Sequence, residues 1–444
     1  MNTKNEFSLV FTRNINDYGR KFIDECAETD IKDSVMYIQK LVEVYNNFKD
    51  IVDRCFENDL SFLLSIDKAF YHIVNENAFL LKYDNKNKNA EFFAKYADFI
   101  LKKCSKIPES EIMEKISSLM AIFNFLTEKD IFLNFYIRYY AKRLINNTSV
   151  GEEYENELIG RLKYICGFDF TLKLEKMRKD MVISKEFTKS FRDQLLTKGI
   201  EKPNFSVNIL TKFTWPYKQK IFCNFPSDLN LLWNEFEGHY TNFYNSRKLN
   251  ILSDISWGEV QSNCFKKHHI FRCCIPQISI LMIYNDKNET TFKEIKNILN
   301  SNDSDVKLII GPLVKRKLLN ISYEFDNTNI TDDTIFTLNT NFLKNKTFID
   351  MTKIDNATST TNNSSSTIMN VEKERIYFLE AVIVRIMKAR KELKHQQLVA
   401  ETLCQVKYRF NPEIKQIKKC INNLIEKEYL KRKETDREVY QYLL

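Results

Sequence analysis

Glycine and proline are scarce in this chain: 8 glycines and 7 prolines occur among 444 residues, beside 34 phenylalanines and 21 tyrosines. Sandwiches and barrels need a turn after every short strand, and these two residues form most such turns. Long helices packed through aromatic side chains need far fewer turns. The composition therefore predicts a mostly α protein. Its length and its 43% apolar residues predict roughly two to four domains.

The sequence contains no segment typical of a membrane or secreted protein. No apolar run approaches the roughly 20 residues that span a bilayer, and the polar start MNTKNEFSLV lacks the apolar core of a signal peptide. The 10 cysteines are scattered without the spacing of a disulfide framework. We therefore expect a soluble protein of the cytoplasm and nucleus, with reduced thiols and no membrane partner.

One group of neighbouring side chains is of the kind that zinc binds. It comprises Cys264, His268, His269, Cys273 and Cys274. The spacing matches none of the usual pairs of zinc ligands, and Ile270 and Phe271 between them predict a strand. We therefore predict no metal site here, with zinc as the less favoured alternative.

Positive charge is concentrated near the carboxyl end. The whole chain has a net charge of +8, and residues 371–444 contain 17 Lys and Arg against 11 Asp and Glu. Basic surfaces attract nucleic acids, acidic proteins or membranes, and charge alone does not decide among them.

Apolar residues recur every three or four positions in the first third of the chain, as in amphipathic helices. The first stripe comprises Val35, Ile38, Val42, Tyr45, Phe48, Val52 and Cys55. Residues 62–74 repeat the pattern, and 126–144 predict a longer helix with aromatic residues on several sides, as in the middle of a bundle. Ser149 and Glu152 are spaced like a capping box that begins the next helix, which Gly167 ends.

The pattern changes after Pro203 to short runs of branched and aromatic residues, which predict irregular strands. These runs are 205–210, 248–252 and 259–265. Between Phe292 and Ser322 the order helix, turn, helix, strand predicts a small winged helix. The polar stretch 355–367 predicts a flexible linker, because it cannot bury enough apolar surface to become ordered.

A compact module follows the linker. Helices are predicted at 377–389 and 395–406, and a third helix is expected to begin with Asn411 as N-cap, Pro412 in the first turn and Glu413 as a favourable acid. Its apolar face carries Ile414, Ile417, Ile421, Leu424 and Ile425. The remaining residues read as strand, charged hairpin and strand, so this module is predicted to be a second winged helix.

Several motifs resemble one known family. The run LTEKDIFLNFYIRYYAKRL at 126–144, followed by ENELIGRLKYICGFDFTLKLEKMRKDM, is similar to the cullin homology region. FSVNILTKFTWP, RKL and SNCFK follow in the order that cullins use. In the tail, AVIVRIMKARKELKHQQL and IKKCINNLIEKEYLKR resemble the cullin neddylation domain almost residue for residue. LKHQQL and SNCFK favour the first cullin subclass, the scaffold of SCF ligases.

The resemblance implies a mostly α chain with a small α/β part. The implied domains are the last helical cullin repeat at 1–82, a four-helix bundle at 83–200, an α/β RING-binding part at 201–285, a first winged helix at 286–354, a flexible linker at 355–369 and the terminal winged-helix neddylation domain at 370–444. Residues 36–44 and 58–77 resemble the last of the family's helical repeats, and the earlier repeats have no counterpart. Because cullins bind the substrate adaptor through the first repeat, we expect no direct binding of a Skp-type adaptor.

The function that the resemblance implies is that of a non-catalytic scaffold in a ubiquitin ligase. Its partners would be a RING-box protein, a ubiquitin-conjugating enzyme and a ubiquitin-like modifier, joined by an isopeptide bond to Lys388 within the family's attachment motif IVRIMK. Contacts with the RING-box protein are implied for Phe205, Val207, Ile209, Trp215, Arg247, Lys248 and Leu249. Asn245 and Ser246 shorten the loop before Arg247 and replace the family's Ser-Gly, so this turn cannot use glycine geometry. Zinc is expected only in the RING partner, and no cofactor in this chain.

Simpler interpretations exist for two of these features. On periodicity alone, Lys388 is a solvated helix lysine, and only the surrounding hexapeptide indicates modification. Lys415, Lys418 and Lys419 are predicted to lie opposite an apolar stripe, which in isolation suggests a winged-helix nucleic-acid-binding regulatory protein. Arginines, which read base edges best, are scarce on that face. The resemblance therefore favours protein docking and no nucleic acid.

A possible basic patch lies in the helical part. It comprises Lys102, Lys103, Lys106, Lys142 and Arg143. It is either a solvated helix face or a docking surface for an acidic conjugating enzyme. No glycine-rich phosphate loop, HExxH or GxSxG motif occurs, and the five histidines form no evident triad. The sequence therefore predicts no catalytic residues.

Overall fold

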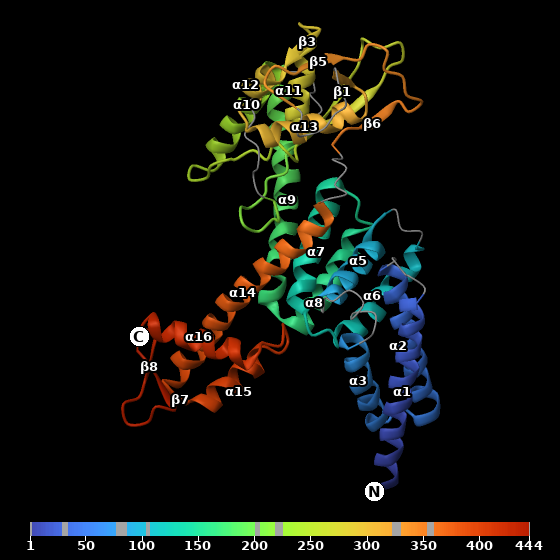
Figure 1. Ribbon diagram of the computed structural model, residues 1–444, viewed down its shortest axis with the longest axis vertical. Coiled ribbons are helices and arrows are strands. Elements are labelled where there is room, and N and C mark those ends of the chain that lie inside the picture. The colour runs from blue at the N-terminus through green and yellow to red at the C-terminus, as the bar shows by residue number, and fades with distance from the viewer. Residues whose placement is uncertain are drawn as a thin grey trace. The chain divides into compact units, whose positions relative to one another are not determined.

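The computed structural model describes residues 2–28, 34–76, 87–103, 107–199, 205–217, 225–321, 330–352 and 359–443. These residues are mostly helical and form three small sheets of three strands each, which confirms the predicted fold class (Figure 1). None of the described helices is long and apolar enough to cross a membrane. The chain divides into two compact units. Unit 1 comprises Met1–Glu186, Ser206–Pro216 and Asn362–Leu444, and unit 2 comprises Phe187–Phe205 and Tyr217–Thr361.

Unit 1 begins with the helices α1 (Asn2–Glu28), α2 (Ser34–Phe56) and α3 (Leu60–Asn75). Asp59 caps α3 by accepting from the Ser61 N–H at 2.9 Å, and its carboxylate also pairs with Lys4 of α1 at 2.6 Å. The predicted stripe on α2 is only partly right. Its members Ile38 and Val52 are buried, but Cys55 is exposed. The buried face also includes Tyr37, Leu41 and Val44, because α2 packs against α3, α5 and α6 at once.

Five helices follow: α5 (Lys88–Leu101), α6 (Glu109–Phe123), α7 (Lys129–Asn146), α8 (Glu152–Cys166) and α9 (Phe168–Thr197). The described residues thus have one helix more here than the expected four-helix bundle. The predicted central helix is confirmed as α7, which has buried residues on several sides, such as Ile131, Phe132 and Leu133.

The predicted capping box of α8 is wrong, although the helix itself and its end at Gly167 are confirmed. Gly151 occupies the N-cap position and makes no side-chain cap. The Ser149 hydroxyl donates instead to the Glu155 carboxylate at 2.6 Å. Tertiary hydrogen bonding to a buried carboxylate therefore replaces the local cap. Gly167 ends the helix with a φ of 87°, a backbone angle that glycine adopts without strain.

Unit 2 contains α10 (Ser227–Phe243), α11 (Ile275–Ile283), α12 (Phe292–Leu299) and α13 (Asp303–Lys315). One sheet has the order β1 (Trp257–Gln261), β2 (Ile270–Cys274), β6 (Phe348–Asp350), and the other has the order β3 (Glu289–Thr291), β5 (Ile335–Leu338), β4 (Leu319–Ile321). The predicted order helix, turn, helix, strand is confirmed by α12, α13 and β4; Ser322 lies outside the described residues. Assignment of this part to the winged-helix class remains a prediction.

Two of the predicted strands of the α/β part are wrong. Residues 205–210 and 248–252 belong to none of the described sheets. The third predicted strand, 259–265, ends early, because β1 stops at Gln261. A branched sequence favours extended backbone, but a strand is formed only when a neighbouring strand accepts its hydrogen bonds.

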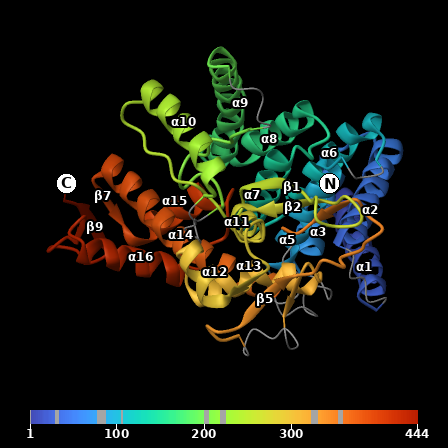
Figure 2. The ribbon, with the colours of Figure 1, turned by 90° about the horizontal axis from the view of Figure 1, so that it is seen from above.

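The carboxy-terminal module of unit 1 consists of α14 (Ser359–Arg390), β7 (Glu392–Lys394), α15 (His395–Val406), α16 (Ile414–Glu426), β8 (Leu430–Arg432) and β9 (Val439–Tyr442). Figures 1 and 2 both show α14 leading into this group of helices and strands. The strand order is β7, β9, β8. Its core includes Ile383, Leu398, Ile417 and Ile421, which confirms the predicted helices and most of the apolar face of the third. Ile414 is the exception, because it is 54% exposed at the start of α16. Its winged-helix class remains a prediction.

Two details of this module differ from the predictions. The N-cap of α16 is Glu413, in a capping box with Gln416, and not Asn411. The expected linker is helical from Ser359 onward, whereas residues 355–358 lie outside the described part. Serine, threonine and asparagine lower helix propensity by less than about 1 kcal/mol each. A helix anchored by a packed apolar half can therefore extend through them, one hydrogen bond per added residue.

Candidate functional site

Lys388 lies in the last turn of α14, on the exposed face of that helix. Ile386 and Met387 before it are buried in the module core and fix the helix against α15 and α16. Its ammonium makes no ion pair or hydrogen bond with the described part of the chain. A cation is also favourable at this place, because a helix carries partial negative charge at its carboxyl end.

The basic neighbours of Lys388, in contrast, are engaged. Arg385 donates to the Gln405 side chain at 2.9 Å, and Arg390 pairs with Glu401 at 3.4 Å. The Lys391 ammonium lies 5.2 Å from the centre of the Tyr442 ring. Of the four cations at this helix end, Lys388 is therefore the one that has no partner among the described residues.

The same helix is held at its other end by an ion-pair cluster within unit 1. Arg375 Nε and Nη2 donate to the two carboxylate oxygens of Asp130 at 2.5 and 2.6 Å, and Nη2 also contacts Glu128. The Arg375 side chain is 16% exposed. Burial by itself lowers the pKa of this guanidinium, but the hydrogen bonds and charges of Asp130 and Glu128 raise it above its ordinary value. Sequence reasoning missed this cluster.

The loop between α15 and α16 contacts the helical part of unit 1 near the same place. The Arg409 carbonyl accepts from the Asp130 N–H at 3.3 Å, and the Asn411 amide donates to the Tyr71 hydroxyl at 3.4 Å. The Arg409 guanidinium lies over the rings of Phe378 and Phe170, 4.3 and 5.9 Å from their centres. The carboxy-terminal module is thus docked on the helices of unit 1 through Arg375 and residues 409–411, which we call the docking contacts.

In the segment 206–216, also in unit 1, residues 206–211 belong to no helix, sheet or turn and are held on one edge by α9, and a turn follows at 212–214. Ile209 exchanges hydrogen bonds with the Ser184 hydroxyl, at 2.7 Å for its N–H and 3.3 Å for its carbonyl. The Asp180 carboxylate accepts from the Thr211 N–H at 2.8 Å and from the Trp215 indole at 2.7 Å. Main-chain groups of an extended chain alternate in direction. Those of Asn208 therefore point away from Ser184 and make no hydrogen bond with the described residues, so this edge is available to another strand.

Trp215 is buried, so it anchors the segment within the chain and offers no surface for a partner. Val207 and Ile209 are half-buried. In unit 2, Phe205 packs between Phe191 and Phe236, with ring centres 5.7 and 5.8 Å away.

The remaining predicted contact residues, Arg247, Lys248 and Leu249, follow α10 in unit 2. Arg247 and Lys248 are exposed, and the Arg247 guanidinium lies 4.3 Å from the centre of the Tyr244 ring. The turn before them forms without glycine, because the Arg247 N–H donates to the Tyr244 carbonyl at 3.3 Å and neither Asn245 nor Ser246 has a positive φ.

A strand edge in unit 2 was not predicted as a binding element. Within the described residues β1 pairs only with β2, so its other edge is free. Its burial alternates strictly, with Trp257 exposed. The alternating sequence WGEVQ is the signal that could have indicated this edge.

The structure places the residues of the expected basic patch differently from the prediction. Arg143 is 1% exposed and pairs with Asp98 and Glu155 at 2.5 and 2.8 Å, so the basic patch does not include it. Lys102, Lys103 and Lys142 are exposed. Lys106 lies outside the described residues.

The residues of the cysteine and histidine group differ in burial. Phe271 and Cys273 lie in strand β2 within the core of unit 2, and burial raises the pKa of the Cys273 thiol to about 12, whereas zinc binds thiolates. Cys264 is exposed. Among the described residues, no three His, Cys, Asp or Glu side chains are grouped to hold a metal ion.

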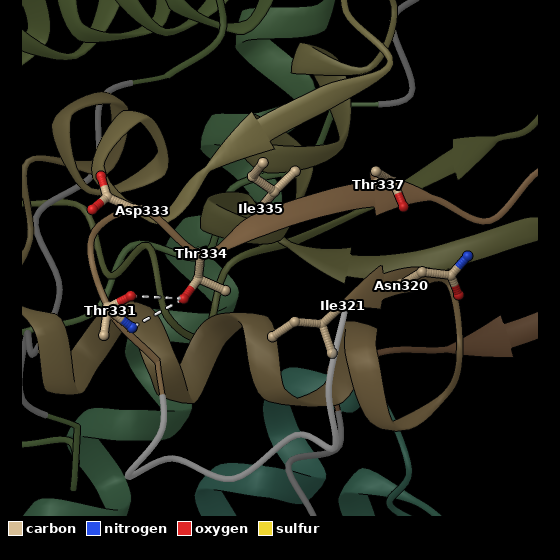
Figure 3. Close-up of a pocket in the computed structure, with 7 residues that line it drawn as sticks. All are labelled: Asn320, Ile321, Thr331, Asp333, Thr334, Ile335 and Thr337. Carbon is tan, nitrogen blue, oxygen red and sulfur yellow. Dashed lines mark hydrogen bonds between the residues drawn. The ribbon is translucent and has the colours of Figure 1, made fainter.

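A shallow hollow of about 450 Å³ lies beside strands β4 and β5 in unit 2 (Figure 3). Its lining is formed by Asn320, Ile321, Thr331, Asp333, Thr334, Ile335 and Thr337. The Thr331 N–H donates to the Thr334 hydroxyl at 3.0 Å, which closes the turn that borders it. These residues include no histidine, cysteine or lysine and one carboxylate, so they form no nucleophile or acid-base pair.

Comparisons of the sequence with family models and with known proteins all match the same family. Residues 1–188 match the model of the cullin alpha solenoid domain, 209–342 that of the cullin alpha+beta domain, and 374–436 that of the cullin protein neddylation domain. The chain is 34% identical over 439 residues to Cullin-1 of Dictyostelium discoideum, covering 97% of this chain and 57% of that protein. It is 32% identical over 434 residues to Cullin-1 of Caenorhabditis elegans, covering 96% and 55%. The chain thus spans little more than half the length of these relatives.

Proposed function

The chain belongs to the cullin family, and from that premise we propose that it is a non-catalytic scaffold subunit of a cullin-RING ubiquitin ligase. The observation that carries the proposal is the exposed amine of Lys388, which has no partner in the described chain and lies within the segment 374–436 matched to the neddylation domain. The match also favours protein docking over the nucleic-acid alternative.

The work of such a scaffold is geometric. It holds a RING-bound conjugating enzyme near a substrate lysine, which raises the effective concentration of one reactant near the other without changing the chemistry. The zinc of the RING partner and the thiol of the conjugating enzyme lie in those proteins, and this chain supplies neither. The exposed Lys102, Lys103 and Lys142 are suited to attract an acidic surface of that enzyme.

We assign RING-box binding to strand addition at segment 206–210. Two features support this assignment. The segment is already extended, so a partner strand does not have to order it. Its edge around Asn208 points away from α9, whose Ser184 and Asp180 hold the opposite edge. The free edge of β1 in unit 2 offers a second place of the same kind.

Asn208→Pro is expected to weaken binding of the RING-box protein about tenfold or more, because it removes a main-chain donor and its ring obstructs the neighbouring strand. The Asn208 side chain is exposed, so the fold should tolerate the change. Biolayer interferometry with purified, zinc-loaded RING-box protein measures the dissociation constant. Asn208→Ala is the control and should bind like the wild type. If the proline variant also keeps the wild-type affinity, this segment is not the site.

We further propose that modification of Lys388 releases the carboxy-terminal module from its docked position. The segment expected to be a flexible tether is helical from Ser359 onward. Among the described residues, the module therefore cannot be released simply by movement of a disordered linker. Release must break the docking contacts at Arg375 and at 409–411. Arg375 and Lys388 are 13 positions apart on one helix, or about 20 Å at 1.5 Å per residue. A bulky modifier at one end can therefore act on the contacts at the other through a rigid element.

A further inference from the structure

Phe213 is the most exposed phenylalanine of the described chain, at 86%. Its backbone has a φ of 67°, in the left-handed region that residues other than glycine seldom occupy. The only cation over its ring in the described residues is the Lys212 ammonium, 5.2 Å from the ring centre. An apolar ring that is almost fully solvated and sits on strained backbone contributes little to the stability of this chain.

The loop that carries Phe213 is nevertheless firmly held. The Asp180 carboxylate accepts from the Thr211 N–H and hydroxyl before it, at 2.8 and 2.9 Å, and from the Trp215 indole after it, at 2.7 Å. The Thr214 N–H closes the turn on the Thr211 carbonyl at 3.2 Å. Thr214 and Trp215 are buried. The ring of Phe213 is thus presented to solvent from a fixed loop, which lowers the entropy that a partner must remove on binding.

We propose that Phe213 is an anchor for the RING-box subunit, whose surface receives the ring in an apolar pocket with an acidic rim facing Lys212. The inference rests on the proposed function, because it names a contact for the same partner. Strained conformations that persist although the chain does not need them are concentrated at binding sites. Aromatic residues, including phenylalanine, are enriched in the cores of interfaces, where a few well-buried residues supply most of the binding energy.

The position of Phe213 in the chain indicates this partner. A strand added along the open edge of 206–210 ends beside Leu210, and Phe213 follows three residues later, within about 10 Å for even a fully extended chain. Residues of the RING-box protein that adjoin its added strand can therefore contact the Phe213 ring. Lys212, exposed beside it, adds the charge that selects an acidic rim.

The test compares Phe213→Ala and Phe213→Gly in the full chain with two measurements. Biolayer interferometry with purified, zinc-loaded RING-box protein should show both variants binding about 10 to 100 times more weakly, the range for loss of a buried aromatic anchor. Thermal unfolding of the chain alone should give the glycine variant a midpoint equal to or above that of the wild type, because glycine relieves the strained φ. A residue with a merely structural role would instead lower the midpoint on removal.

Phe7→Ala is the matched control, since Phe7 on α1 is also highly exposed, at 68%, and should leave binding unchanged. Wild-type affinity in both Phe213 variants, with binding still lost in Asn208→Pro, would overturn the anchor and leave the proposed function standing. No binding of RING-box protein by the wild-type chain would instead reject the proposed function and the anchor with it.

Discussion

Replacing Lys388 by arginine is expected to abolish attachment of the ubiquitin-like modifier and to leave the fold unchanged. In the transfer, the Lys388 amine loses a proton and attacks the thioester carbonyl carbon at the modifier's carboxyl end. An N–C bond forms, the C–S bond breaks and the thiolate of the conjugating enzyme leaves. Arginine keeps the positive charge at the end of α14 but is no longer a usable nucleophile. Because Lys388 is exposed, stability should change by less than about 0.5 kcal/mol.

The reaction is followed by incubating the chain and RING-box protein with the modifier and its activating and conjugating enzymes, and then mapping the adduct by mass spectrometry. Lys394→Arg is the matched control, because Lys394 is an exposed lysine six positions further along, at the start of α15. The control should be modified at the wild-type rate. An adduct formed at full yield on Lys391 or Lys394 in the Lys388→Arg chain would refute the assignment.

Arg375→Ala is expected to undock the carboxy-terminal module. The change leaves the carboxylates of Glu128 and Asp130 without their cation while they are only 21% and 10% exposed. Breaking a buried pair in this way costs about 3–5 kcal/mol, and the partial exposure of Glu128 places the expected cost at the lower end. Even a cost of about 3 kcal/mol shifts the equilibrium between docked and undocked module about a hundredfold toward the undocked state. Hydrogen exchange should then increase at residues 409–411, which lose their contacts with Asp130 and Tyr71.

Two further variants separate this ion-pair effect from general damage. Combining Arg375→Met with Glu128→Gln and Asp130→Asn removes all the charges together and should restore much of the protection, because no buried charge is left unpaired. Lys173→Ala removes a surface pair with Glu374 at 3.9 Å, in which both side chains are about half exposed, and should change little. Equal exchange at 409–411 in Arg375→Ala and the wild type would show that this cluster does not hold the module.

The elements that could be predicted from the sequence are those fixed by local periodicity. The core of the carboxy-terminal module is one example: Ile417, Ile421 and Leu424 are spaced for a helix face and are buried as a face of α16. Lys388 differs from them. Periodicity could place it on an exposed helix side, but only the surrounding hexapeptide indicated a chemical role.

The predictions that failed depended on tertiary contacts and not on the local sequence pattern. Ser149 has the spacing of a capping residue, but its hydroxyl donates to the buried Glu155, which also binds Arg143. The same carboxylate removes Arg143 from the predicted basic patch. Residues 205–210 have the composition of a strand, but nothing in a local pattern says whether a strand lies beside them.

The docking contacts could not be predicted from the sequence for the same reason. Arg375 and Asp130 are 245 residues apart, and although Asp130 lies in the motif at 126–144, nothing in that motif indicates a pairing with Arg375. Phe213 gave no signal because its conformation, and not its residue type, is unusual. Long-range ion pairs and strained backbone are set by tertiary packing, which a single sequence does not reveal without the structure.

The central claim is that this chain is a scaffold switched on through Lys388, and the rate of ubiquitin-chain formation tests it most directly. The measurement uses zinc-loaded RING-box protein, ubiquitin and its activating and conjugating enzymes, with the chain absent, present, or present and modified on Lys388. Chain formation should rise when the scaffold is added and rise again after modification, while Lys388→Arg treated with the modifying enzymes should stay at the unmodified rate. Equal rates with and without the chain, or with and without modification of Lys388, would contradict the account.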